Sequence, residues 1–392
     1  MNSTSALSDR LRSAVRRQRL VDTAVKLIEV PSPTGSAGAV SDRLADLLRE
    51  DGFTVERPEA GHAAAPAVVV RLKSGRPGRT LQFNGHLDTV HLPFVAPGQD
   101  GGNLTGSGAS DMKGGVAAAV EALRVLRDTE ALEAGSVLLT AHDLHEAPWG
   151  ACQQLERLIR DGCVGDAVLL PEPLCDRLPI AGRGGATWRV TIRRGGPPVH
   201  EVMRPADEPS VIAAGADLVT RLGNLGQRLA LKEHPIAGRE TVFIGQIHSG
   251  EIFNQYPQEC WLEGTRRWLP GTSSQEVEGE FRRLLAELAD QTGTTIEVDY
   301  RVIRDAFLLE ITDPLCLAFQ RAYETVSGQP LATGPKPFID DGNTFWGLKQ
   351  VPAITHGPRA GGQHTLHEWV AIDDLERVAH LYALTAVLYC GA

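Results

Sequence analysis

The chain has 392 residues, of which 42% are hydrophobic, and it carries a formal charge of −10 at pH 7. This length predicts two domains, because a single hydrophobic core rarely extends beyond about 250–300 residues. The acidic balance argues against a nucleic-acid-binding protein, which needs a basic face. The longest apolar runs are too short to cross a bilayer.

Two further features bear on the cellular compartment. The N-terminal segment carries basic side chains but no apolar stretch after them, so it does not have the pattern of a secretion signal. The 6 cysteines form no C-x-x-C pair and no dense framework, which favours reduced thiols. We therefore expect a cytoplasmic protein without a membrane or nucleic-acid partner.

From about residue 10 to residue 182, helical patterns alternate with short apolar strands. Helices are predicted at 21–30, 40–50 and 114–127, and strands at 67–72, 80–86, 135–143 and 166–172. This alternation is typical of an α/β layer around a central sheet. The ends of the strands in such a sheet are where chemistry usually takes place.

A different pattern begins near Gly182. It predicts a strand at 186–194, a helix at 209–225, strands at 241–247 and 259–268, a helix at 276–291 and a strand at 294–303. The first pattern then resumes and ends in a predicted helix at 373–389. We expect a smaller α+β domain, residues 183–303, inserted between two segments of a larger domain, residues 1–182 and 304–392.

Polar side chains follow the predicted strands of the larger domain or lie in its loops. They are His86, Asp88, Asp111, His142, His145, Glu146, Glu172 and His364. A single residue of this kind is usually a hydrogen-bonded or surface group, but several at corresponding strand ends predict a metal centre. Histidine and carboxylate ligands without thiolates suit zinc, cobalt or manganese, and a carboxylate can bridge two ions.

Four segments, HLDTV, GSGASDMKGGVAA, LLPEP and QHTLHEW, occur in an order that resembles the M20 family of metal-dependent peptidases and amidohydrolases. The resemblance covers nearly the whole chain. It implies a zinc-peptidase-like α/β catalytic domain with a mixed central sheet, interrupted by a smaller α+β lid domain through which the protein forms a homodimer. It also implies two divalent metal ions, zinc before cobalt or manganese, and hydrolysis of an amide-type C–N bond in a small-molecule substrate.

The same resemblance implies roles for individual residues. His86, Asp111 and Glu172 would hold one ion, and Asp111 and His364 would help to hold the other. Asp88 would accept a hydrogen bond from the second ring nitrogen of His86, which fixes the tautomer and raises ligand basicity. The plainer interpretations are a turn-forming carboxylate for Asp88 and a helix N-cap for Asp111.

The third motif departs from the family pattern. Where members carry D-E-E-x-G, this chain has HDLHEAPWGA. An alignment without gaps places Leu144 at the position of the general base and His145 at that of the ligand, whereas a shift of one residue makes His145 the base and Glu146 the ligand. Chemistry favours His145 as ligand and Glu146 as base, because a carboxylate near two cations can take a proton from metal-activated water. A further alternative is a homologue that has lost its base and binds without turnover.

Substrate contacts are implied in the smaller domain. His200 in GGPPVHE matches the family's G-x-x-x-H and would donate a hydrogen bond to the carbonyl oxygen under attack, often from the partner subunit. Asn254 in GEIFNQYP and Arg267 in GTRRWLPG match family segments, and a guanidinium suits a substrate carboxylate. These contacts favour an N-acyl amino acid or a dipeptide-like substrate. Surface exposure of His200 and a strand-end ion pair for Arg267 are the alternatives.

Several neighbouring residues have supporting roles in this interpretation. Asp341 and Asn343 occupy the place of the family's G-G-T-D segment and are expected to shape the pocket. His142 would support the site through hydrogen bonds or end its strand, and Trp149 would pack beneath the altered motif or line the pocket. The altered motif also makes an aromatic or other non-peptide amide an alternative substrate.

Overall fold

The computed structural model describes residues 3–148 and 150–391, which form two compact units. Unit 1 comprises the chain up to Ile180, then Leu309–Gly334, and the chain from Asp340 onward. Unit 2 comprises Ala181–Leu308 and Pro335–Ile339. The chain therefore leaves unit 1 twice, first to form most of unit 2 and again at Pro335–Ile339, and returns each time.

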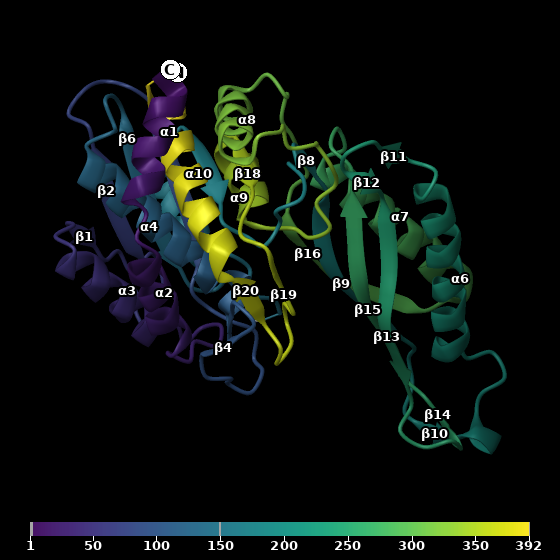
Figure 1. The fold of residues 1–392 in the computed structure, drawn as a ribbon. Helices are drawn as coiled ribbons and strands as arrows, with labels where there is room; N and C mark the ends of the chain where they lie inside the picture. The colour runs from purple at the N-terminus through teal and green to yellow at the C-terminus, as the bar shows by residue number, and fades with distance from the viewer. Residues whose placement is uncertain (1–2, 149, 392) are drawn as a thin grey trace. The chain divides into compact units, whose positions relative to one another are not determined.

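A mixed sheet in the order β1-β2-β6-β3-β7-β18 is the centre of unit 1 (Figure 1). Its strands are β1 (Val55–Glu56), β2 (Val68–Lys73), β3 (Thr80–His86), β6 (Ser136–His142), β7 (Ala167–Leu170) and β18 (Ala353–Thr355). The last four are mutually parallel, whereas β1 and β2 run antiparallel to their neighbours. The predicted α/β class with a mixed central sheet is confirmed.

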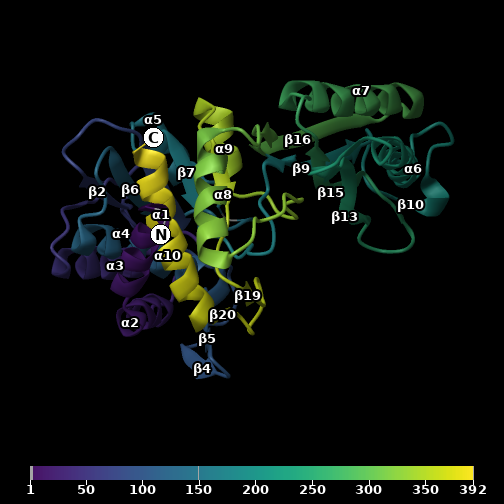
Figure 2. The same cartoon turned by 45° about the horizontal axis from the view of Figure 1, so that its top comes forward.

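Helices cover both faces of this sheet (Figures 1 and 2). They are α1 (Ser3–Ala14), α2 (Arg17–Ile28), α3 (Gly38–Glu50), α4 (Gly114–Thr129), α5 (Gln153–Arg160), α8 (Pro314–Ser327), α9 (Asp341–Lys349) and α10 (Ile372–Cys390). On one face, Phe83 of β3 stacks on Tyr382 of α10 with ring centroids 5.6 Å apart. On the other, Leu155 of α5 and Phe345 of α9 share a buried cluster with β7.

Successive side chains of β3 point to opposite faces of the sheet, and this decides which neighbours each of them contacts. Phe83 and Gly85 face α10 and α4, so Asn84 and His86 face the side covered by α5 and α9. The parallel register sets His86 directly beside His142 of β6. Because the carboxyl ends of β3, β6 and β7 lie at one edge, the polar residues that follow them are brought together.

A second, smaller sheet in unit 1 has the order β19-β20-β5-β4. Its strands are β4 (Gly98–Asp100), β5 (Asn103–Thr105), β19 (Ala360–Gly361) and β20 (Trp369–Ala371). Pairing of β20 with β5 joins the segment before Asp111 to the segment after His364. These two candidate ligands thereby come from opposite ends of the chain to one place.

Unit 2 contains the antiparallel sheet β13-β15-β9-β16, with two helices packed on one face. The elements are β9 (Gly184–Arg193), α6 (Val211–Leu229), β13 (Thr241–Ser249), β15 (Glu259–Trp268), α7 (Ser274–Thr292) and β16 (Thr295–Arg304). Short strands complete the unit: β8 (Ala181–Gly182), β10 (Val199–His200), β11 (Glu233–His234), β12 (Gly238–Arg239), β14 (Gln255–Tyr256) and β17 (Phe307–Leu308). The six main elements follow in the predicted order, which confirms the α+β character of this part.

The alternating pattern of β9 explains the core of unit 2. Val190 and Ile192 point into a buried cluster with Leu218 of α6 and Phe281 of α7. A capping box between Ser273 and Glu276 begins α7. Within the residues that the structure describes, no helix combines the length and the apolar composition needed to span a membrane.

Candidate metal centre

Asp111 lies at the centre of the polar cluster at the carboxyl edge of the main sheet. Its Oδ1 is 3.1 Å from Nε2 of His86, and its Oδ2 is 3.3 Å from Nε2 of His364. The two oxygens therefore face two different histidines. This is the arrangement that a carboxylate bridging two metal ions requires.

The turn that carries Asp111 is held in place by Glu368. The turn, η1 (Ala109–Lys113), follows β5. Oε2 of Glu368 accepts hydrogen bonds from the backbone N–H groups of Ser110 and Asp111, each at 3.2 Å, and from the Ser110 hydroxyl at 3.0 Å. Glu368 thus fixes the carboxylate of Asp111 through the backbone.

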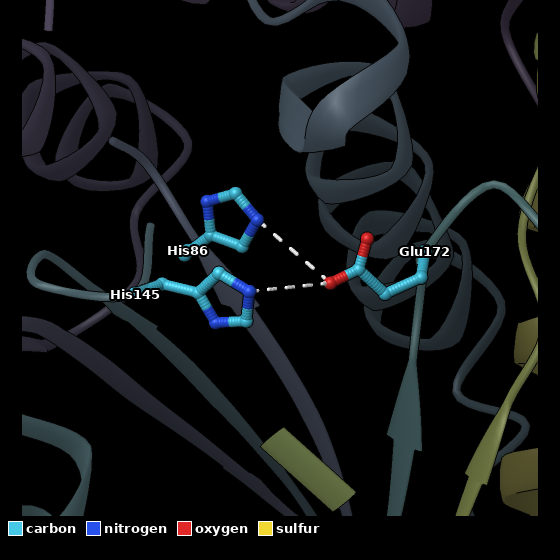
Figure 3. Close-up of side chains that lie close together, drawn as sticks. All are labelled: His86, His145 and Glu172. Atoms are coloured by element: carbon cyan, nitrogen blue, oxygen red, sulfur yellow. Dashed lines mark ion pairs between the residues drawn. The ribbon is translucent and has the colours of Figure 1, made fainter. Parts of the chain in front are cut away.

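The first donor group contains His86, His145 and Glu172 (Figure 3). Oε1 of Glu172 lies 3.8 Å from Nε2 of His86 and 3.9 Å from Nε2 of His145. The two imidazole rings stack, with centroids 4.0 Å apart and planes inclined by 5°. Both rings therefore direct a nitrogen toward the same carboxylate.

The second donor group contains Asp111 and Glu146, which also lie close to His86, together with His364, which pairs with both carboxylates. Nε2 of His364 lies 3.2 Å from Oε2 of Glu146, close to its distance from Asp111. Hydrogen bonds to these two carboxylates raise the pKa of His364 to about 10. The ring thus holds a proton where two carboxylates converge, which is where a cation would bind.

The charges of the cluster fit divalent cations. Burial and the neighbouring charge of Asp111 raise the pKa of Glu172 well above its usual range. Burial alone would raise the pKa of Asp111 as well, but hydrogen bonds from His364 and His86 hold it well below its usual range. The neighbouring His86 therefore does not offset the burial of Glu172, and a bound divalent cation would supply further positive charge.

The distances between donors also fit. Ligands at 2.0–2.2 Å around a tetrahedral ion are separated by roughly 3.3–3.6 Å. The separations from 3.1 to 3.9 Å between the histidine and carboxylate atoms are of this size. Oxygen and imidazole donors suit zinc, cobalt or manganese.

Asp88 makes a contact that differs from the expected one. Nδ1 of His86 donates to the backbone carbonyl of Asp88 at 2.9 Å, whereas the carboxylate Oδ1 is 3.6 Å away. Oδ2 of Asp88 instead accepts from the backbone N–H groups of His145 and Glu146, each at 3.0 Å, and from the Thr34 hydroxyl at 2.9 Å. The carboxylate positions the altered motif, and the backbone sets the tautomer of His86.

Sequence reasoning placed Asp341 near the pocket but missed its partners. Its Oδ1 lies 2.8 Å from Nδ1 of His145, and its Oδ2 lies 2.8 Å from both Nε2 of His142 and Nδ2 of Asn84. The available signal was the asparagine inside the apolar strand at 80–86, because a buried amide needs a polar partner. Trp149 lies outside the described residues.

The three residues expected to contact substrate belong to unit 2. The structure brings two of them together, since Nδ2 of Asn254 lies 3.2 Å from Nε2 of His200, where β10 pairs with β14. Arg267 lies near the carboxyl end of β15, next to Trp268, whereas β14 precedes the amino end of that strand. Burial and the nearby Arg183 lower the pKa of Arg267. His200 and Arg267 therefore occupy different parts of this unit.

Comparison with known proteins identifies a matching family and several relatives of this chain. Residues 82–387 match the family described as "Peptidase family M20/M25/M40". A succinyl-diaminopimelate desuccinylase of Methylobacterium radiotolerans is 34% identical over 391 residues, covering 92% of this chain and 94% of the relative. One of Gluconacetobacter diazotrophicus is 26% identical, covering 91% of this chain and 93% of the relative.

Solved structures share the fold. Aminopeptidase PepT of Bacillus cereus superimposes with a TM-score of 0.81 at 19% identity, covering 96% of this chain and 99% of that one. The Bacillus subtilis protein YXEP, described as a dinuclear metal binding peptidase, gives 0.71 at 17% identity, covering 96% and 98%. The resemblance stated from the motifs is confirmed: the chain belongs to peptidase family M20/M25/M40 and is a metal-dependent hydrolase.

Proposed function

We propose that this protein hydrolyses the amide-type C–N bond of a small N-acylated substrate, with removal of an acyl group from an amino acid ahead of peptide cleavage. The observation that carries the proposal is Asp111, whose two oxygens face two histidines that each have a second carboxylate beside them. The relatives named desuccinylases support an acyl–amine bond as the target.

In this proposal each ion has three donors from the protein. His86, Asp111 and Glu172 would hold one, and Asp111, Glu146 and His364 would hold the other. Two divalent ions, zinc first among the candidates, would supply Lewis acidity, which lowers the pKa of water and polarises an amide carbonyl. The protein fixes the directions of the donor atoms, because the strand ends and the turn bound by Glu368 hold these side chains in place.

We assign acceptance of the water proton to Nε2 of His145. Nδ1 of this ring donates to Asp341, so Nε2 keeps a lone pair, and this nitrogen lies 3.9 Å from Oε1 of Glu172. Glu146 lies with Asp111 and His364, which supports a ligand role for it. These distances favour the alignment shifted by one residue over the assignment preferred from chemistry alone, in which His145 ligates and Glu146 is the base. The proton would then pass from His145 to the leaving nitrogen.

The residues of unit 2 complete the proposal. His200 would donate to the carbonyl oxygen, and Asn254 and Arg267 would bind the substrate. Nη1 of Arg267 is buried without a hydrogen-bond partner among the described residues, which supports a carboxylate ligand. We also propose a homodimer through unit 2, whose edge strand β13 exposes Phe243 and Ile247. No two cysteines of the described chain form a disulfide, which supports a cytoplasmic location.

Removal and return of metal test this function. Protein stripped with a chelator should lose hydrolysis of a panel of N-acyl amino acids, dipeptides and aryl amides, and should regain it with zinc, cobalt or manganese. The second candidate, a non-catalytic binder, would instead be stabilised by a panel compound without turnover. Hydrolysis that persists at full rate after complete metal removal would contradict the proposal.

A further inference from the structure

His145 depends on other residues for its orientation. It lies in the loop after β6, with its ring stacked on His86 and Nε2 3.9 Å from Glu172. A neutral imidazole has two tautomers, and only the one with the proton on Nδ1 leaves a lone pair on Nε2. Whichever group contacts Nδ1 therefore decides whether Nε2 can accept a proton.

Sγ of Cys152 lies 3.8 Å from this nitrogen, and the closer group is Asp341, the first residue of α9. Its Oδ1 lies 2.8 Å from Nδ1 of His145 and 3.1 Å from Sγ of Cys152. Its Oδ2 lies 2.8 Å from both Nε2 of His142 and Nδ2 of Asn84. The side chain of Asp341 is 2% exposed, so these contacts are shielded from water.

The partners of Asp341 are themselves fixed. Asn84 is held because its Oδ1 accepts from the Thr140 hydroxyl at 2.8 Å, which turns its NH₂ toward Asp341. Nδ1 of His142 lies 3.0 Å from the Asp143 carbonyl, which turns Nε2 toward the same carboxylate. Neighbouring strands β3 and β6 thus supply two donors to one oxygen, and the other oxygen contacts His145 and the thiol of Cys152.

We propose that Asp341 is a positioning residue that holds His145 in the tautomer protonated on Nδ1, with Nε2 directed at the metal centre, and that Asn84 and His142 hold Asp341. The proposal rests on the proposed function only in taking Nε2 of His145 as the acceptor of the water proton. It explains why a carboxylate is needed, because a carboxylate accepts on both oxygens whereas an amide has one acceptor and one donor end.

The substitution Asp341→Asn tests this directly. Asn84 still requires an acceptor, so the new amide oxygen should face Asn84 and the new NH₂ should face Nδ1 of His145. The ring should then move its proton to Nε2. Long-range ¹H–¹⁵N correlation spectra of the metal-free, full-length protein, at a pH where the ring is neutral, report the tautomer. The signal of His145 is identified by its absence in His145→Gln.

We expect the parent protein to show the proton on Nδ1 and the variant to show it on Nε2. The variant should still bind two metal ions per chain, and its kcat should fall on the order of 10³–10⁴-fold, as when the orienting carboxylate of a catalytic histidine becomes an amide. KM should change by less than about threefold, because substrate contacts are untouched. Asp340→Asn is the matched control, since it removes a buried carboxylate one residue away that accepts hydrogen bonds from the Gly342 N–H and the Thr355 hydroxyl.

Three results would overturn the inference. They are a parent protein with the proton on Nε2, an unchanged tautomer in Asp341→Asn, and loss of a metal ion in that variant. The first of these needs no variant, so it decides the matter even if Asp341→Asn does not fold. The tautomer and the metal content need no substrate, so a parent protein that hydrolyses no amide would contradict the proposed function alone.

Discussion

Asp111 contacts His364, which comes from a distant part of the sequence, and this contact shows how single side chains decide the chemistry of the site. His364 reaches it from a loop in which its own backbone has a φ of 59°. Non-glycine residues adopt this left-handed conformation at a cost of about 1–2 kcal/mol, and such positions cluster at functional sites. The cost is consistent with a loop that folds to direct one imidazole.

His380 provides a pH test away from the metal centre. Its ring lies 3.0 Å from the Ser8 hydroxyl, and burial lowers its pKa to about 4. The unfolded chain takes up this proton near pH 6.5, so the folded protein loses stability as the pH falls from about 6.5 toward 4. His380→Gln cannot titrate. Between pH 7 and pH 5 it should lose about 2 kcal/mol less unfolding free energy than the parent, measured by urea denaturation. Equal losses in the two proteins would refute this explanation of His380.

Among the secondary-structure elements, β20 pairs with β5 and so brings Glu368 to the turn that carries Asp111. Glu368, just before β20, accepts the hydrogen bonds that fix the turn of Asp111. Glu368→Ala should therefore weaken metal binding by about 10–100-fold, the usual effect of losing a residue that orients a ligand. Competition with a calibrated chelator measures this affinity.

The control for that experiment lies in the same loop. His367 is exposed and precedes Glu368, so His367→Ala should bind metal as the parent does. If both variants bind metal like the parent, the turn is held by the sheet pairing and not by Glu368. A loss in both would mean that the loop as a whole, and not the carboxylate, is responsible.

Over the whole molecule, the fold was accessible from the sequence because its elements are strongly periodic. Apolar runs predicted β3, β6 and β7, and the polar residues after them predicted the metal centre. The contact of Asp341 with His145 joins positions 196 residues apart, and no local pattern encodes it. The roles of His145 and Glu146 depend on a shift of one residue in the alignment with the family motif. Leu144, just before them, has a φ of 65°, and hydrophobic periodicity does not predict this turn of the chain.

The metal content of two variants tests the central claim, that Asp111 bridges two ions with Glu146 as a ligand and His145 as proton acceptor. In Glu146→Gln, we expect one ion to remain tightly bound and the other to be lost or weakened on the order of 100-fold, because a neutral amide replaces a carboxylate ligand. In His145→Gln, two ions should remain while hydrolysis falls on the order of 10³-fold or more. Two ions retained in Glu146→Gln together with one lost in His145→Gln would contradict the claim and would make Glu146 the base.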